Sequence, residues 1–443
     1  MSFYKNNKFI ILVLSISFLL RILFSMDNVK MLFSDISAYD NFASNIIEHG
    51  NMYNSAYQAP GYTYFIALIY KLLGHSLFNV YIMQAVLGTG STLLIYLIAK
   101  NIFNEKIGKL SSGLSLLYWP LTLYSGILLA EILFIFLLLS GVFMFLKALD
   151  TDKLKYFSLS AVFFSLATLT RSITLFFLFV IPVLYLIYKF SYMLKKISLL
   201  KDIFNYTDNG KALVAFKISI VMRNIIIFVC IFCMMLTPWV VRNYLKYNAF
   251  IPVDTLGGIN LYIGNNDKSN GTFVSIVDDP EYNTGKNDYE TDKRLKSLAV
   301  KYIINHPLKF TGLTVVRGVL FASMDLYSFD WVLIKYMENN FLFNYCTIFW
   351  IIFMALCCLS FFVLGIFGIK NLLQNFKGAN LLVFVLYFFS LTSVFYVQYR
   401  YRLPVMPFMA ISAAFGYEHF KKYSQKLIYK FSKSNKKLPS MDV

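Results

Sequence analysis

Charged residues are scarce in this sequence of 443 residues, at 14%, whereas 58% of the residues are hydrophobic. With a mean hydropathy of +0.61, this composition excludes a soluble globular protein. The formal net charge of +18 would suit a nucleic-acid partner, but the basic residues lie mostly in short loops and in the C-terminal tail. We therefore interpret the positive charge as a signal of membrane topology and expect no nucleic acid as a partner.

Cysteine and histidine are also rare, with five and four copies. All five cysteines fall in apolar runs, where we expect buried packing residues: Cys230, Cys233, Cys346, Cys357 and Cys358. A Cys-x-x-Cys pair inside a membrane helix is weak evidence for redox or metal chemistry. The first apolar run has no small-residue cleavage site after it, so we expect residues 1–26 to be a retained anchor.

Long apolar runs dominate what is present, and a helix needs about 20 such residues to cross a bilayer. The runs predict about ten spans, with nine to thirteen as the outer limits, at residues 8–26, 76–99, 110–128, 129–147, 156–171, 173–189, 224–241, 343–369, 379–398 and 404–420. Alternate loops are rich in lysine and arginine, at 100–109, 147–155, 189–223, 370–377 and 421–437. The positive-inside rule then places both termini in the cytoplasm.

Two segments on the opposite, outer side are too long to be plain connections. The first, residues 27–75, has apolar residues at helical spacing after Asp35 until Gly50, and then a short apolar run after Pro60. We predict two amphipathic helices there, lying at the membrane surface. The second segment, residues 242–342, begins with a loop over 253–270 and continues with a helix over 292–319. We divide the chain into a transmembrane catalytic core (1–241), an extracytoplasmic region (242–342), C-terminal transmembrane helices (343–420) and a basic cytoplasmic tail (421–443).

Ionisable side chains stand at the outer ends of several spans, where charge is costly and is often functional. On the predicted topology they share one face with Asp35: Glu131, Arg171, Arg242, Arg400 and Arg402. Arginine offers a planar fork that matches phosphate oxygens, and a carboxylate can take the proton of an attacking hydroxyl. Two carboxylates can instead hold a divalent cation such as Mg or Mn, so Asp35 and Glu131 are also candidate metal ligands.

The same residues lie in an ordered set of short motifs that resembles the bacterial branch of the protein mannosyltransferase and aminoarabinose transferase superfamily. The motifs are Asp35-x3-Tyr39, Ala59-Pro60-Gly61-Tyr62, Glu131, Leu169-Thr170-Arg171, Thr237-Pro238-Trp239-x2-Arg242-Asn243, Gly257-Gly258-x-Asn260 with Gly264-Asn265-Asn266, and Arg400-Tyr401-Arg402-x-Pro404. They extend over nearly the whole chain. The family pairs its first aspartate with a glutamate, whereas Ile36 follows Asp35 here.

The resemblance implies an all-α polytopic membrane protein with the GT-C fold that transfers a sugar from a polyprenyl-phosphate donor on the outer face of the bacterial inner membrane. It implies catalytic roles for Asp35 and Glu131 and donor-phosphate contacts for Arg171, Arg242, Arg400 and Arg402. Tyr39, Pro60, Tyr62, Asn243 and Asn265 are weaker candidates for substrate contact. The acceptor would be an extracytoplasmic protein, lipid or glycan, and the enzyme would also contact membrane lipid.

A transporter or flippase of lipid-linked sugars is the alternative function. It would also place arginines near lipid phosphate, but it should carry polar groups or broken helices in the middle of its spans. In this sequence charge lies mainly at span ends. We therefore favour the transferase.

Overall fold

The computed structural model describes residues 2–26, 35–50, 55–200, 208–282, 287–323, 360, 363–366, 368–369, 372–373 and 376–435. Nearly all regular structure in these residues is helical, and the only bridge between extended segments joins Thr272 and Val397. The fold class predicted by the apolar runs and by the family resemblance, an all-α polytopic membrane protein, is confirmed.

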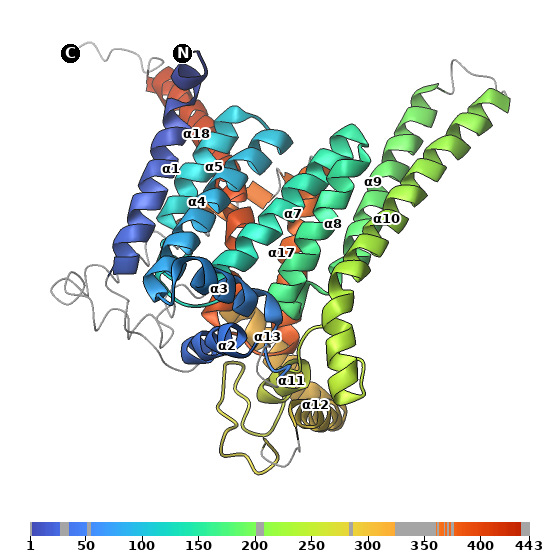
Figure 1. The fold of residues 1–443 in the computed structure, drawn as a ribbon. Helices are drawn as coiled ribbons and strands as arrows, with labels where there is room; N and C mark the ends of the chain where they lie inside the picture. Colours follow the sequence, from blue (N-terminus) through green and yellow to red (C-terminus); the bar gives the residue numbers. More distant parts are fainter. Residues whose placement is uncertain are drawn as a thin grey trace, which may run out of the picture.

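Long helices form a bundle, and shorter helices gather at one end of it (Figure 1). The bundle helices are α1 (Ser2–Met26), α4 (Leu77–Ile102), α5 (Glu105–Leu117), α7 (Glu131–Thr151), α8 (Leu154–Thr170), α9 (Phe177–Leu200), α10 (Asp208–Tyr247), α17 (Phe376–Val394) and α18 (Met406–Asn435). The shorter helices are α2 (Asp35–His49), α3 (Pro60–Leu73), α11 (Gly257–Gly264), α12 (Asp288–Asn305) and α13 (Pro307–Ser323). The first residues of α1 and the last residues of α18 lie at the opposite end of the bundle from α2 and α12.

Six helices among the described residues are long and apolar enough to cross a bilayer. They coincide with six of the ten predicted spans, at Lys8–Met26, Leu77–Ile102, Glu131–Thr151, Ser172–Ser191, Ile218–Tyr247 and Phe376–Val394. The predicted span 156–171 corresponds to the shorter apolar helix α8, and 404–420 overlaps the first part of α18. The span predicted at 343–369 falls largely outside the described residues. The protein is a multi-pass membrane protein, and the count of ten stays a prediction.

The predicted span 110–128 is not one continuous helix. Helix α5 ends at Leu117, and the chain then turns through α6 (Pro120–Leu123) and the 3-10 turn η1 (Tyr124–Gly126) before α7 begins at Glu131. The sequence Tyr-Trp-Pro at 118–120 accounts for the break, because proline cannot continue an α-helix and favours a new first turn. We call residues 118–130 the bend.

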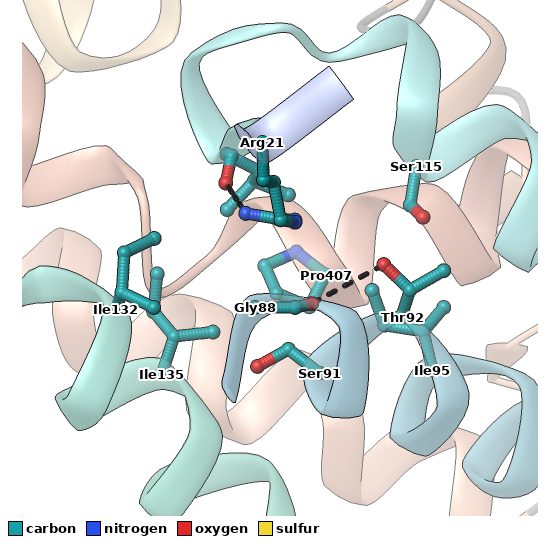
Figure 2. Close-up of a pocket in the computed structure, with 10 residues that line it drawn as sticks. Arg21, Gly88, Ser91, Thr92, Ile95, Ser115, Ile132, Ile135 and Pro407 are labelled. Atoms are coloured by element: carbon teal, nitrogen blue, oxygen red, sulfur yellow. Dashed lines mark hydrogen bonds between the residues drawn. The ribbon is translucent and has the colours of Figure 1, made fainter. Parts of the chain in front are cut away.

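Two buried polar side chains from earlier helices hold the bend. Arg21 of α1 donates to the Leu121 carbonyl and to the Ser125 hydroxyl (2.6 Å), beside Gly88 of α4 (Figure 2). Gln84 donates to the carbonyls of Ser125 (3.0 Å) and Ile127 (2.9 Å). Backbone carbonyls freed by a break at membrane depth need such donors, because lipid supplies none. Arg21 is 3% exposed and Gln84 is fully buried.

Two other expectations are corrected. The segment 253–270 is not a loop throughout, because α11 begins at Gly257, where Asp292 accepts from the Gly258 and Ile259 amides (3.2 Å for Ile259). Such a carboxylate satisfies the free N–H groups of a helix start. The predicted helix 292–319 is two helices, α12 and α13, because Pro307 begins a new helix after His306.

The two described cysteines are not buried packing residues. Cys230 and Cys233 are exposed on α10, while the other three lie outside the described residues. Only 22% of the apolar α10 segment is buried inside the protein. Apolar residues of a membrane helix can face lipid instead of protein, so hydropathy alone does not predict burial here.

The two amphipathic helices predicted after the first span are present as α2 and α3. Helix α3 begins against the end of α8: a Cβ added to Gly61 would lie 2.8 Å from the Leu169 carbonyl oxygen and 2.8 Å from Thr170 Oγ1. Pro60 at the first position of α3 fixes the backbone for helix entry. The Pro60-Gly61 pair therefore places α3 directly beside the residue that follows α8, Arg171.

Candidate active site

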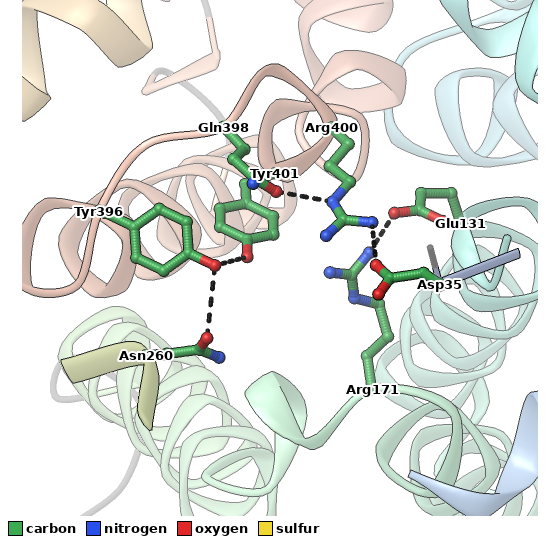
Figure 3. A network of polar contacts seen from close by, with 8 residues as sticks. All are labelled: Asp35, Glu131, Arg171, Asn260, Tyr396, Gln398, Arg400 and Tyr401. Carbon is green, nitrogen blue, oxygen red and sulfur yellow. Dashed lines mark hydrogen bonds and ion pairs between the residues drawn. The ribbon is translucent and has the colours of Figure 1, made fainter. Parts of the chain in front are cut away.

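Two ion pairs form the centre of the candidate site, at the end of the bundle where the short helices gather. Arg400 Nη1 lies 3.0 Å from Asp35 Oδ2, and Arg171 Nη1 lies 2.6 Å from Glu131 Oε1. Figure 3 shows the two guanidinium groups pointing toward the two carboxylates. We call these four residues the ion-pair cluster. They come from positions far apart in the sequence, as the predicted topology required.

Each member lies at the end of a helix or in a short turn. Asp35 begins α2 and Glu131 begins α7, so both carboxylates lie at the positive end of a helix dipole. Arg171 caps the C-terminus of α8, and Arg400 lies in the 3-10 turn η4 (Tyr399–Arg402). The helix ends thus place two negative and two positive side chains at one point.

The two carboxylates differ in access. The Asp35 side chain is 37% exposed, whereas that of Glu131 is 2% exposed. Burial lowers the pKa of Arg400, but the Asp35 charge and its neighbours raise it well above its ordinary value. For Arg171 burial is likewise opposed by the Glu131 charge, and its pKa is raised. Both arginines therefore stay charged, and Asp35 is the carboxylate that a substrate can reach.

Tyrosine rings and amides surround the ion-pair cluster. The Tyr401 ring lies 5.5 Å from the Arg171 guanidinium and 5.8 Å from that of Arg400. Its hydroxyl lies 2.8 Å from that of Tyr396, which lies 3.3 Å from Asn260 Oδ1 of α11 (Figure 3). Gln398 accepts from Arg400 Nε at 2.8 Å. Cation–π contact and hydrogen bonds together fix the orientation of the arginines.

Tyr39 lies beside the ion-pair cluster, and its contact with substrate stays a prediction. Its ring packs edge-on against that of Tyr62 at 4.9 Å, and burial followed by the charges of Asp35 and Glu131 raises its pKa. Tyr62 itself is fully buried and donates to Gln84 Oε1 at 2.7 Å. The geometry gives Tyr62 a packing role, since its hydroxyl is used within the protein.

Other predicted site residues are placed elsewhere. Arg242 lies over the Trp239 ring at 4.8 Å and donates to Asn243 at 2.9 Å, rather than entering the two ion pairs. Asn243 donates to the Ile251 carbonyl at 3.0 Å, which holds the turn after α10. Pro60 lies at the start of α3, beside the end of α8. Arg402 is 2% exposed, and its contact with the donor stays a prediction.

Asn265 belongs to a buried hydrogen-bond network around Arg317, a residue that the sequence analysis missed. Arg317 is fully buried on α13 and donates to the carbonyls of Gly264, Ser393 (3.2 Å) and Val394 (3.0 Å) and to Asn265 Oδ1 (3.3 Å). A Cβ on Gly264 would collide with the Phe395 carbonyl at 1.7 Å, so only glycine fits there. The Gly264-Asn265-Asn266 motif thus joins α11 to the end of α17.

Asp254 is a further carboxylate near Arg171. It accepts from the Leu256 amide at 3.3 Å and from the Ser172 hydroxyl. Burial raises its pKa to about 6, against these hydrogen bonds and the Arg171 charge, which lower it. No motif used in the sequence analysis contains Asp254.

The ion-pair cluster as it stands does not fit a divalent cation. Each carboxylate already accepts from a guanidinium, and a cation at Asp35 and Glu131 would lie beside two positive charges. In the described part of the chain, no group of three or more His, Cys, Asp or Glu side chains could hold a metal ion.

Comparison with known proteins supports the fold. The apo oligosaccharyltransferase of Archaeoglobus fulgidus has a TM-score of 0.52 with 13% identity, covering 98% of this chain and 53% of the archaeal one. The chain has the GT-C fold. The same archaeal enzyme tethered to an acceptor peptide gives a TM-score of 0.50 with 14% identity, covering 94% and 50%. Apo ArnT from Cupriavidus metallidurans gives 0.49 with 13% identity, covering 96% and 62%. The chain spans about half the length of the archaeal enzyme.

Family comparison agrees over part of the chain. Residues 57–204 match the model of the dolichyl-phosphate-mannose-protein mannosyltransferase family. The resemblance to this superfamily, inferred from the ordered motifs, is therefore confirmed over these residues. No curated protein matches the sequence.

Proposed function

We propose that this protein is a glycosyltransferase that moves a sugar from a polyprenyl-phosphate donor to an acceptor hydroxyl. The observation that carries the proposal is the ion-pair cluster: two carboxylates and two arginines at one end of a membrane bundle. The GT-C fold and the family match over residues 57–204 support the same reaction class.

The arginines are suited to the departing lipid phosphate. A guanidinium binds phosphate oxygens in a two-pronged geometry like the one it uses for carboxylates. Arg400 and Arg171 are held over one tyrosine ring, so their positive charges are in place before the reaction begins. Preorganised donors of this kind are worth about 3 to 4 kcal/mol each in the transition state.

Asp35 is suited to act as the general base. The acceptor hydroxyl oxygen forms a bond to the anomeric carbon while its proton passes to Asp35. The bond between that carbon and the phosphate oxygen breaks, and its electron pair stays on the phosphate between the arginines. When the donor phosphate engages Arg400, the Asp35–Arg400 pair opens, so donor binding itself frees the base. Glu131 stays buried and holds Arg171 in position.

The proposed side of action is the outer face of the bacterial inner membrane. The lysine-rich loops 100–109 and 147–155 lie at the end of the bundle opposite to the ion-pair cluster. The positive-inside rule assigns this opposite end to the cytoplasm. The acceptor we propose is a protein, lipid or glycan outside the cell. The archaeal enzyme of the same fold has been seen with an acceptor peptide.

The test is Asp35→Asn, which keeps the shape of the side chain and removes its charge. We expect the rate of labelled-sugar transfer from a polyprenyl-phosphate donor to fall by roughly 10² to 10⁴, the usual contribution of a general base. Asp278→Asn, at an exposed loop position, is the matched control and should transfer at the parental rate. A parental rate for Asp35→Asn, with an unchanged melting temperature, would refute the proposed mechanism.

A further inference from the structure

A cavity that is separate from the ion-pair cluster lies between α11, α12 and the chain that follows α11. Its volume is about 320 Å³, and its lining includes Tyr262, Asp279, Leu298, Lys301, Tyr302 and Asn305. None of the four ion-pair residues lines it. We call it the α11–α12 cavity. Its size is at the lower end of the range for small-ligand sites, about 300 to 1,000 Å³.

The lining is chemically mixed. Two tyrosine side chains and Leu298 supply apolar surface, and carboxylates, lysines and amides supply hydrogen-bond donors and acceptors. Three carboxylates (Asp267, Asp279 and Glu281) face two lysines (Lys268 and Lys301), so the formal charge of these groups is close to balanced. Because Glu281 is also paired with Arg294, two carboxylates and two lysines remain, and neither a polyanion nor a polycation would find an excess of opposite charge here. A neutral ligand with many hydroxyls can use both kinds of group.

Several lining residues are already held in place. Tyr262 donates to Asp279 Oδ2 at 3.1 Å, and Glu281 pairs with Arg294. Burial and the bond to Asp279 raise the pKa of Tyr262 to about 12, so its hydroxyl stays protonated. The Tyr302 ring packs on that of His306 at 4.6 Å. Side chains fixed before binding lose little freedom when a ligand enters.

The cavity is linked to the candidate active site through α11. Tyr262 lines the cavity, and Asn260, two residues earlier, contacts Tyr396 and through it Tyr401. A small apolar core of Ile259, Ile263, Ile276, Leu295 and Tyr396 packs against Tyr262, Leu298 and Tyr401. One rigid unit therefore connects the cavity lining to the tyrosine that lies beside both arginines.

We propose that the α11–α12 cavity binds a sugar ring of the acceptor and holds it while a more distant hydroxyl reaches Asp35. This inference rests on the proposed transferase function. The tyrosine rings would cover the C–H face of the sugar, and the carboxylates, Lys301 and Asn305 would bind its hydroxyls. The acceptor is then a glycan or glycolipid rather than a bare peptide.

The experiment measures saccharide binding by saturation-transfer NMR on the full-length protein in detergent, with glucose, galactose, mannose and N-acetylglucosamine as probes. The variants are Tyr262→Ala and the double change Lys301→Ala with Asn305→Ala. Lys301 and Asn305 are both exposed, so the double variant should fold even if Tyr262→Ala does not. Lys293→Ala is the control, because Lys293 lies on the same helix but does not line the cavity.

We expect at least one probe to bind the parent and the Lys293→Ala control equally, and to bind the double variant roughly tenfold more weakly, or about 1.4 kcal/mol. In transfer assays with a glycan acceptor, the double variant should raise KM for the acceptor and leave kcat nearly unchanged. Binding that is equal in parent and double variant overturns the inference. So does the absence of binding by every probe at millimolar concentration, or binding of acceptor peptide alone at this cavity.

Asp35→Asn separates this inference from the proposed function. It should slow transfer as stated above and leave saccharide binding unchanged, because Asp35 does not line the cavity. If no transfer is found for any donor but saccharide binding is lost in the double variant, the cavity assignment stands and the transferase proposal fails. If transfer depends on Asp35 and no probe binds, the transferase stands and the cavity assignment fails.

Discussion

Arg317 and the two arginines of the ion-pair cluster lie in different regions of the described structure, and their partners differ. At the junction of α11, α13 and α17, Arg317 donates to backbone carbonyls and to one amide oxygen. In the ion-pair cluster, Arg171 and Arg400 pair with the carboxylates of Glu131 and Asp35. Arg317 is fully buried, whereas the side chains of Arg171 and Arg400 are 23% and 18% exposed.

The comparison separates a structural arginine from one that can take a substrate. The carbonyls around Arg317 are at the C-terminal ends of α11 and α17, where the helix dipole favours a positive charge. They are fixed parts of the backbone, so no ligand can replace them. A carboxylate side chain can turn away when a phosphate arrives. The ion-pair cluster is therefore the region where an anion can be exchanged.

Among the variants that test this comparison, Arg400→Met gives the largest expected effect on activity. It removes the guanidinium that is proposed to bind the lipid phosphate, and it leaves Asp35 without its partner. Transfer should therefore slow by roughly 10² to 10³. Arg400→Lys keeps the charge but loses the two-pronged geometry and should recover only part of the rate. The readout is kcat for labelled-sugar transfer, with Arg223→Met on the exposed face of α10 as control. An Arg400→Met enzyme as fast as the control would place the phosphate elsewhere.

Arg317→Met should affect stability more than chemistry. The change removes the donor to the Gly264 and Ser393 carbonyls inside a buried site, and we expect a loss of about 3 kcal/mol. The melting temperature in detergent should fall more than in Arg400→Met, while protein that is folded at low temperature keeps most of its kcat. If Arg317→Met is stable but inactive, the division between the two kinds of arginine is wrong.

Asp254→Asn gives the smallest expected effect, and that effect depends on pH. The pKa of Asp254 is about 6 in the folded protein and 3.8 ordinarily, so ionisation opposes folding. The penalty is absent below about pH 4, grows as pH rises toward 6, and is constant above that pH. Parent protein should therefore lose melting temperature between pH 4 and 6 relative to Asp254→Asn. Parallel melting curves for the two proteins over that range would contradict the raised pKa.

The spans were the most predictable part of the fold. Hydropathy located six helices within a few residues, because a bilayer requires an apolar length that sequence shows directly. It failed at 110–128, where the apolar run continues but Pro120 ends the helix. The sequence pattern also predicted one helix over 292–319, where the structure has α12 and α13 separated at His306-Pro307. In both places a local backbone rule overrode an apolar or helical pattern.

The site was partly predictable for the same reason. A charged residue at the end of an apolar span must lie near the membrane surface or pair within the protein. This constraint predicted Asp35, Glu131, Arg171 and Arg400 as site residues. Arg242 was predicted on the same grounds, yet it packs on Trp239, since span ends fix depth but not the direction around the helix axis. Arg317 was missed although it interrupts the run Leu-Thr-Val-Val-Arg-Gly-Val-Leu. Its partners are backbone carbonyls, which carry no sequence signal.

The bend has a consequence for how the protein is made. Its donors precede it in the chain, Arg21 by 100 residues to Leu121 and Gln84 by 41 residues to Ser125. Synthesis proceeds from the N-terminus, so α1 and α4 leave the ribosome before the bend that they hold. The bend can therefore form its hydrogen bonds to Arg21 and Gln84 as it enters the membrane. Helix α7 then begins at Glu131 at its final depth. The order of synthesis thus matches the order in which the end of the bundle that carries the ion-pair cluster is assembled.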